Sequence, residues 1–81
     1  MAAVVQINPT SPAHHVSPRF GEFLYEYAQD FALKYCWLDP EPDVIEALRT
    51  IRPDGPEEAE AIRQILALLA AGDEVEILYG Y

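Results

Sequence analysis

Proline is the residue that most constrains how this chain can fold, because it fixes its own φ angle and cannot donate a backbone hydrogen bond. Seven prolines occur in the 81 residues. The interior of a helix does not tolerate proline, whereas the first turn of a helix does. Helices can therefore begin at Pro18, Pro40 and Pro56, and Pro53 ends the second of them. Residues 8–18 hold three prolines and are expected to form an extended linker.

Apolar residues recur at steps of three and four in the three segments that the prolines delimit, which predicts amphipathic helices. The first is expected over about 18–37 with Ser17 as its N-cap, and the second over about 40–52 with Asp39 as its cap. The third is expected over about 56–71, ended by Gly72 in the left-handed conformation. The first helix is apolar on most sides, so we expect it to be central in the fold or buried by a partner.

Two short segments have the pattern of strands. Residues 3–7 are rich in β-branched side chains, and residues 74–81 alternate apolar with other residues. The sequence therefore predicts a single α+β domain of three helices and two short strands. Within it, residues 1–17 form an N-terminal strand and proline-rich linker, and residues 18–81 form an acidic helical domain with a C-terminal strand. The two strands either pair with each other or one of them offers its edge to another chain.

Negative charge dominates the composition. Fourteen Asp and Glu residues stand against five Lys and Arg, and all fourteen acids lie in residues 21–81. Nucleic acids and anionic membranes repel such a surface, because both are negatively charged and are bound by cationic side chains of proteins. We therefore expect no direct nucleic-acid partner and no membrane partner. A protein with a basic surface is the electrostatic complement, while solubility is the ordinary alternative reason for the charge.

Eight of the acids stand at the starts of the second and third helices, where the helix dipole favours them; they are Asp39, Glu41, Asp43, Glu46, Asp54, Glu57, Glu58 and Glu60. The other six oppose local electrostatics. Three follow one another at four-residue steps along the first helix, and three follow the negative end of the third helix. We predict that these six bind a partner, with two tyrosines as anchors: Glu22, Glu26, Asp30, Asp73, Glu74, Glu76, Tyr25 and Tyr79.

Catalytic signatures are missing from the sequence. The four glycines are scattered and form no phosphate-binding loop. Cys36 stands between two aromatic residues, a context that favours an inert buried thiol. His14 and His15 match no zinc-binding spacing. We therefore expect no catalytic residue, no metal site and no cofactor, and a protein that is not an enzyme.

A lone cysteine excludes an internal disulfide and favours a reducing compartment. The N-terminal residues have no basic region of the kind that begins a secretory signal. The longest apolar run, residues 65–71, is far shorter than the roughly 20 residues of a membrane span. A cytoplasmic location is the expectation that follows.

In size, acidity and domain count the chain resembles phage-encoded inhibitors of nucleic-acid machinery, anti-CRISPR proteins among them; the resemblance covers no motif. Carboxylates one helical turn apart, about 6 Å, approximate the phosphate spacing of one nucleic-acid strand. The leading hypothesis is that the chain is a small non-catalytic binding protein that inhibits or regulates a partner. The partner has a basic, nucleic-acid-binding surface, and the carboxylates of this chain bind there in place of nucleic acid. The alternative is an antitoxin-like assembly or adaptor subunit. Such a subunit would bury the first helix, which holds seven of the nine aromatic residues, or the C-terminal strand in an oligomer. A homo-oligomer is one form of this alternative.

Overall fold

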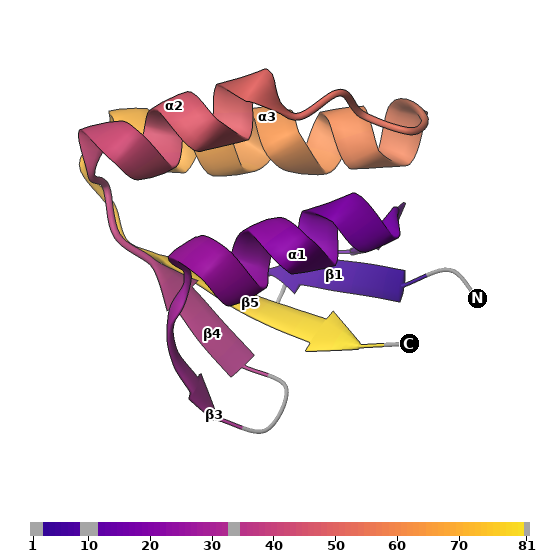
Figure 1. Ribbon diagram of the computed structural model, residues 1–81, viewed down its shortest axis with the longest axis horizontal. Coiled ribbons are helices and arrows are strands. Elements are labelled where there is room, and N and C mark those ends of the chain that lie inside the picture. Colours follow the sequence, from indigo (N-terminus) through magenta and orange to yellow (C-terminus); the bar gives the residue numbers. More distant parts are fainter. Residues whose placement is uncertain (1–2, 9–11, 33–34, 81) are drawn as a thin grey trace.

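Strands and helices are interspersed along the chain and form one α+β unit, as the sequence predicts. The computed structural model describes residues 3–8, 12–32 and 35–80, with residues 30–32 as backbone. Within these residues Figure 1 shows three helices on one side of a five-stranded sheet. In chain order the elements are β1 (Ala3–Ile7), β2 (Ala13–Val16), α1 (Pro18–Tyr27), β3 (Gln29–Ala32), β4 (Tyr35–Leu38), α2 (Pro42–Thr50), α3 (Pro56–Ala70) and β5 (Val75–Gly80).

The sheet has the order β2-β1-β5-β4-β3, and every neighbouring pair is antiparallel. The N-terminal and C-terminal strands pair with each other, with Val5 opposite Tyr79. On its other side β5 pairs with β4, with Cys36 opposite Ile77. Because β5 is bonded on both sides within the chain, the suggestion that this strand is an edge available to another chain is wrong. Tyr81, the last residue of the predicted strand, lies outside the described residues.

The first helix begins behind Ser17 as predicted but ends at Tyr27, ten residues before the predicted end. Two strands, β3 and β4, follow in place of the rest of that helix. In β4 the side chains alternate: Cys36 and Leu38 are buried beside β5, while Tyr35 and Trp37 turn to the other face. The strand buries these two residues against the sheet, in the same core to which α1 contributes Phe20, Phe23 and Leu24. Residues 33–34 of the predicted helix lie outside the described part.

The segment expected to be a linker contains β2, which pairs with β1. Prolines favour extended backbone before and after them, and Pro12 and Pro18 flank this four-residue strand. Proline has no place inside a sheet but is tolerated at an edge, which is where β2 lies. Strands from both sides of residue 17 thus share one sheet. Residues 9–11 of the linker lie outside the described residues.

The starts of α2 and α3 follow the proline pattern, with Pro42 and Pro56 in the first turn. Glu41, and not Asp39, is the N-cap of α2, and it makes no side-chain capping bond. Gly72 has a φ of +88° just after α3, as expected for the residue that ends a helix in the left-handed conformation.

One face of the sheet forms the core. Alternate residues of the strands point to this face, where α1 and α3 pack against them and α2 packs against both helices (Figure 1). The buried sheet residues are Ala3, Val5, Ile7, Val16, Cys36, Leu38, Val75, Ile77 and Tyr79. The opposite face carries the other half of the alternation, which includes Val4, Tyr35, Trp37 and Leu78. No described helix covers that face.

The close contact of α1 with β5 at Gly21 provides a test of this packing. A Cβ atom at residue 21 would overlap the phenol group of Tyr79. We expect Gly21→Ala to lower the free energy of unfolding by about 1–3 kcal/mol through overpacking, offset in part by up to about 1 kcal/mol of better helix propensity. Chemical denaturation measures the difference. Gly55→Ala is the control, since nothing lies within 4 Å of a Cβ there; equal effects of the two substitutions would contradict the packing.

Candidate protein-binding site

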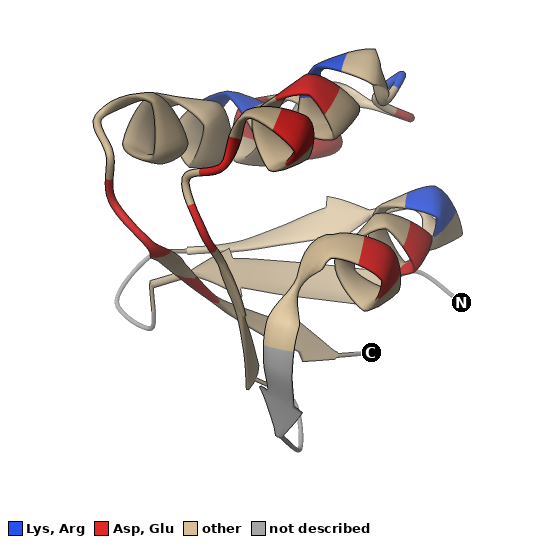
Figure 2. Ribbon diagram, turned by 60° about the vertical axis from the view of Figure 1, so that its left-hand side comes forward, with Lys and Arg blue, Asp and Glu red and all other residues tan. Residues whose placement is uncertain are grey.

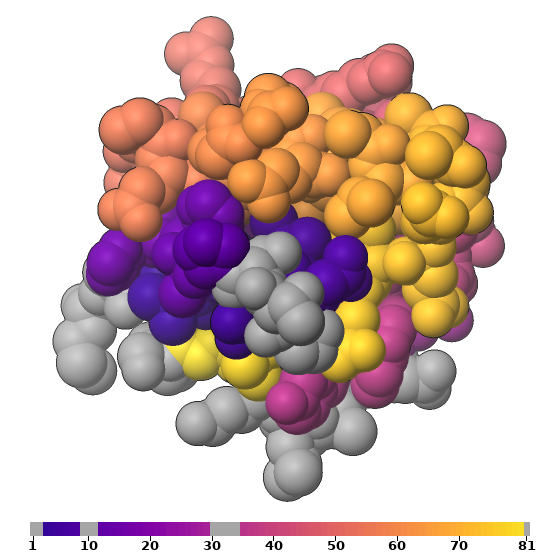
Figure 3. Space-filling model, turned by 180° about the vertical axis from the view of Figure 1, so that it is seen from behind, coloured from indigo at the N-terminus to yellow at the C-terminus, as the bar shows by residue number. Residues whose placement is uncertain are grey.

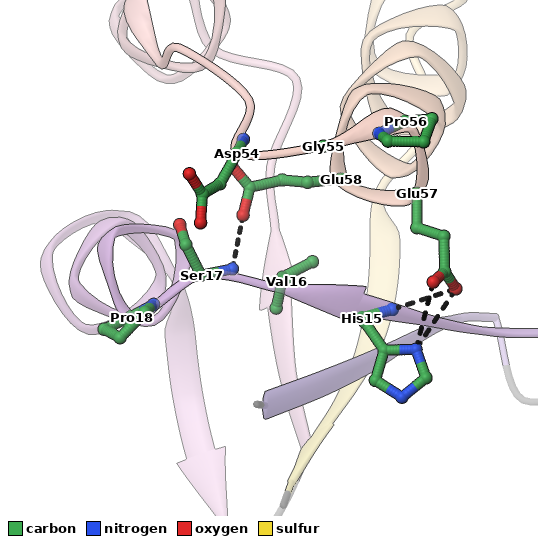
Figure 4. A pocket seen from close by; sticks show the side chains of 9 residues that line it. All are labelled: His15, Val16, Ser17, Pro18, Asp54, Gly55, Pro56, Glu57 and Glu58. Carbon is green, nitrogen blue, oxygen red and sulfur yellow. Dashed lines mark hydrogen bonds and ion pairs between the residues drawn. The ribbon is translucent and has the colours of Figure 1, made fainter. Parts of the chain in front are cut away.

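A pocket of about 380 Å³ lies where β2 meets the start of α3. Figure 3 shows α3 lying directly against β2, and Figure 4 shows the polar groups between them. Glu57 accepts a hydrogen bond from the backbone N–H of His15 at 3.3 Å, and its other oxygen lies 3.1 Å from Nδ1 of the same residue. These contacts with His15 hold the pKa of the Glu57 carboxyl below its usual value.

Glu58, next to it, is 1% exposed although it carries a carboxylate. One oxygen accepts a hydrogen bond from the N–H of Ser17, and the other accepts one from the N–H of Asp54 at 3.0 Å. Buried carboxylates need such partners. Together Glu57 and Glu58 satisfy the N–H groups of His15 in β2 and of Ser17 just after it. Unpaired N–H groups at a sheet edge would otherwise be open to pairing with another strand.

This pocket has the residue types of a hydrolase but not their arrangement. Figure 4 shows Ser17 Oγ pointing away from His15, whose ring faces Glu57. Ser17 Oγ is buried without a hydrogen-bond partner among the described residues. A nucleophile must lie within hydrogen-bond reach of its base. The two carboxylates here accept hydrogen bonds from the backbone N–H groups of His15, Ser17 and Asp54.

Glu58→Gln tests that structural role. An amide keeps one acceptor oxygen but presents N–H₂ to a backbone N–H, which leaves a buried donor unsatisfied. We expect a loss of about 1–3 kcal/mol in the free energy of unfolding, with faster hydrogen exchange at the amides of Ser17 and Asp54. Glu57→Gln, which alters the neighbouring exposed carboxylate, is expected to have a much smaller effect. An unchanged stability of Glu58→Gln would contradict the clamp.

Cys36 lies in the core at 0% exposure. Burial raises the pKa of its thiol to about 11, and a nucleophilic cysteine needs the thiolate. Among the residues that the structure describes, no three His, Cys, Asp or Glu side chains are grouped to hold a metal ion.

Alkylation of Cys36 checks its burial. With a pKa of about 11, roughly one thiol in a thousand is ionised at pH 8. We expect iodoacetamide to modify the folded protein far more slowly than the protein unfolded in denaturant, and at a rate that follows the opening of the fold. Rapid labelling of the folded protein would contradict an inert core thiol.

Acidic side chains of α1 lie on its outer face. Glu22 and Glu26 are exposed one helical turn apart, and neither forms an ion pair with another described residue. Asp30 does not continue their row, because α1 ends at Tyr27 and Asp30 belongs to β3. The predicted row of three carboxylates on one helix is therefore wrong; the Asp30 side chain lies outside the described residues.

A second acidic surface forms where two connections leave the same end of the sheet (Figure 2). Leu38 of β4 stands opposite Val75 of β5, so the next positions along the two strands are Asp39 and Glu74. Asp73 and Glu74, which the sequence singles out, are exposed there. The sheet-end cluster, as we call it, consists of Asp39, Glu41, Asp73 and Glu74.

The sequence did not indicate that Asp39 and Glu41 share a surface with Asp73 and Glu74. The position of Asp39 and Glu41 at the start of a helix already gave a local reason for their charge. The pairing of β4 with β5, which the sequence did not predict, was the missing signal. Glu76 lies beside this cluster on the open face of the sheet, half-buried and opposite Trp37.

The two predicted tyrosine anchors differ in exposure. Tyr25 is 71% exposed on α1. Tyr79 is 9% exposed and packs against Gly21 in the core, so it offers no anchor to a partner. Strand alternation places it with Val75 and Ile77, on the face that the helices cover.

A groove of about 300 Å³ separates α1 from α2. Five residues of α1 line one side: Arg19, Glu22, Phe23, Glu26 and Tyr27. Ala47 and Thr50 of α2, with Ile51 just after it, line the other. The groove thus has apolar side chains and the two exposed carboxylates of α1 in the same lining.

Comparison with known proteins finds no family model, no curated protein and no solved structure that matches this chain. In the part of the chain that the structure describes, no helix has the length and apolar character needed to cross a membrane. Any function must therefore be inferred from the surfaces described above.

Proposed function

We propose that this protein is a small, non-catalytic binding protein of the cytoplasm that inhibits or regulates a partner with a basic, nucleic-acid-binding surface. Its carboxylates would bind the Lys and Arg side chains of the partner that otherwise bind phosphates of the nucleic acid. The proposed function is that of the phage-encoded inhibitors which the chain resembles in size and acidity.

The sheet-end cluster is the observation that carries the proposal. Two pairs of acids more than 30 residues apart meet at one end of the sheet, so negative charge is concentrated there. A concentration of carboxylates is suited to long-range attraction of a basic protein.

The open face of the sheet favours a second candidate, an assembly or adaptor subunit. Tyr35 is 37% exposed there, and it stands directly opposite Leu78 in the neighbouring strand. Trp37 and Val4 lie on the same face. Aromatic and aliphatic side chains in such an arrangement are common in buried interfaces.

Affinity capture separates the two candidates. The tagged protein is used to capture proteins from its native cells at about 0.15 M and about 0.5 M NaCl, since salt screens charge attraction. We expect a nucleic-acid-handling protein that is lost at the higher salt and whose nucleic-acid binding this chain inhibits. The substitution E41Q/D73N should slow association of that pair several-fold, with a smaller effect on dissociation.

The control E46Q/D54N removes the same charge from exposed residues outside the sheet-end cluster and should leave association near the wild-type rate. If both variants slowed association equally, the effect would come from the total charge of the chain, and the sheet-end cluster would have no specific role. Capture of this chain alone, at both salt concentrations, would contradict the inhibitor and favour the assembly subunit.

A further inference from the structure

Apolar side chains form part of the lining of the groove between α1 and α2. The rings of Phe23 and Tyr27 lie side by side with centroids 5.3 Å apart. Tyr27 and Ile51 are half-buried, so part of each remains open to contact from outside. A volume of about 300 Å³ lies at the lower limit of ligand pockets, which suits one long side chain.

The rim of the groove is negatively charged. Glu22 and Glu26 repel each other by a few tenths of a kcal/mol at this spacing. Arg19 lines the groove as well, yet neither carboxylate pairs with it or with any other described residue. The last turn of α1 holds no basic residue, although a base there would favour the negative end of the helix. Among the residues that the structure describes, no basic group neutralises this charge.

We infer that the groove receives an arginine side chain of the partner, whose guanidinium binds Glu22 and Glu26 while its methylene stem packs on Tyr27 and Ile51. The inference rests on the proposed function and assigns one place at which the basic partner is held.

Arginine fits this geometry better than lysine. Its planar guanidinium has five N–H donors and can serve two carboxylates one helical turn apart, about 6 Å. The ammonium of lysine is a compact point charge that reaches one of them. The methylene stem of the arginine covers apolar surface, here Tyr27 and Ile51, and leaves the guanidinium free for the two carboxylates.

A titration of the ¹⁵N-labelled protein, followed by NMR, tests the inference with N-acetyl-arginine methylamide as the probe. We expect saturable shifts at the amides of Glu22, Glu26, Thr50 and Ile51, with a dissociation constant in the millimolar range. N-acetyl-lysine methylamide should bind several-fold more weakly. Shifts that are absent, or that spread over the sheet-end cluster as well, would overturn the inference.

Three variants sharpen the test. E22Q/E26Q should weaken the probe at least about fivefold, as expected for the loss of exposed charge-assisted bonds, while E46Q/D54N, with the same change in charge, should bind it like the wild type. Thr50→Arg places a guanidinium of the chain itself at the groove and should block the probe. Equal binding of the arginine probe by E22Q/E26Q and wild type would refute the assignment.

The outcomes distinguish this inference from the proposed function. A captured partner that E41Q/D73N weakens and that E22Q/E26Q binds like the wild type would uphold the function and overturn the groove. Occupation of the groove by arginine, together with capture of this chain alone, would uphold the groove as an arginine site and overturn the function.

Discussion

The buried carboxylate of Glu58 is the contact on which the arrangement of the helices depends. It accepts hydrogen bonds from the N–H of Ser17, the N-cap of α1, and from that of Asp54, just before α3. It therefore lies between the N-terminal ends of two helices, each of which carries about half a positive charge. This placement compensates for removing the carboxylate from water and joins the end of β2, the start of α1 and the α2–α3 connection at one point.

Helix starts could be predicted from the sequence because the constraint that proline imposes is local. Pro18 and Pro56 begin α1 and α3 as expected, and α2 begins at Pro42 instead of Pro40. The end of α1 could not be predicted in this way. It depends on the pairing of Cys36 in β4 with Ile77 in β5, forty-one positions further along the chain. The helical spacing of the aromatic residues contains no information about that distant partner.

The candidate site divides along the same line. Glu22 and Glu26 are exposed on one side of α1 as their spacing predicts, because helical periodicity is local. Glu58 looks in the sequence like any acid at a helix start, and its burial arises from the approach of Ser17. Tyr79 looks like an interface residue until Gly21 is placed against it. Which of two similar side chains is surface and which is core was decided by tertiary contacts.

The central position of β5 has a consequence for how the chain folds. It is the last of the elements to be synthesised, and it inserts between the β1–β2 and β3–β4 hairpins. Until it arrives, β1 and β4 each expose a row of unpaired backbone groups beside apolar side chains, the condition in which nascent strands associate wrongly. Non-local pairing of this kind is slow, so the edges of β1 and β4 are open to wrong association during synthesis. Insertion of β5 covers both edges at once.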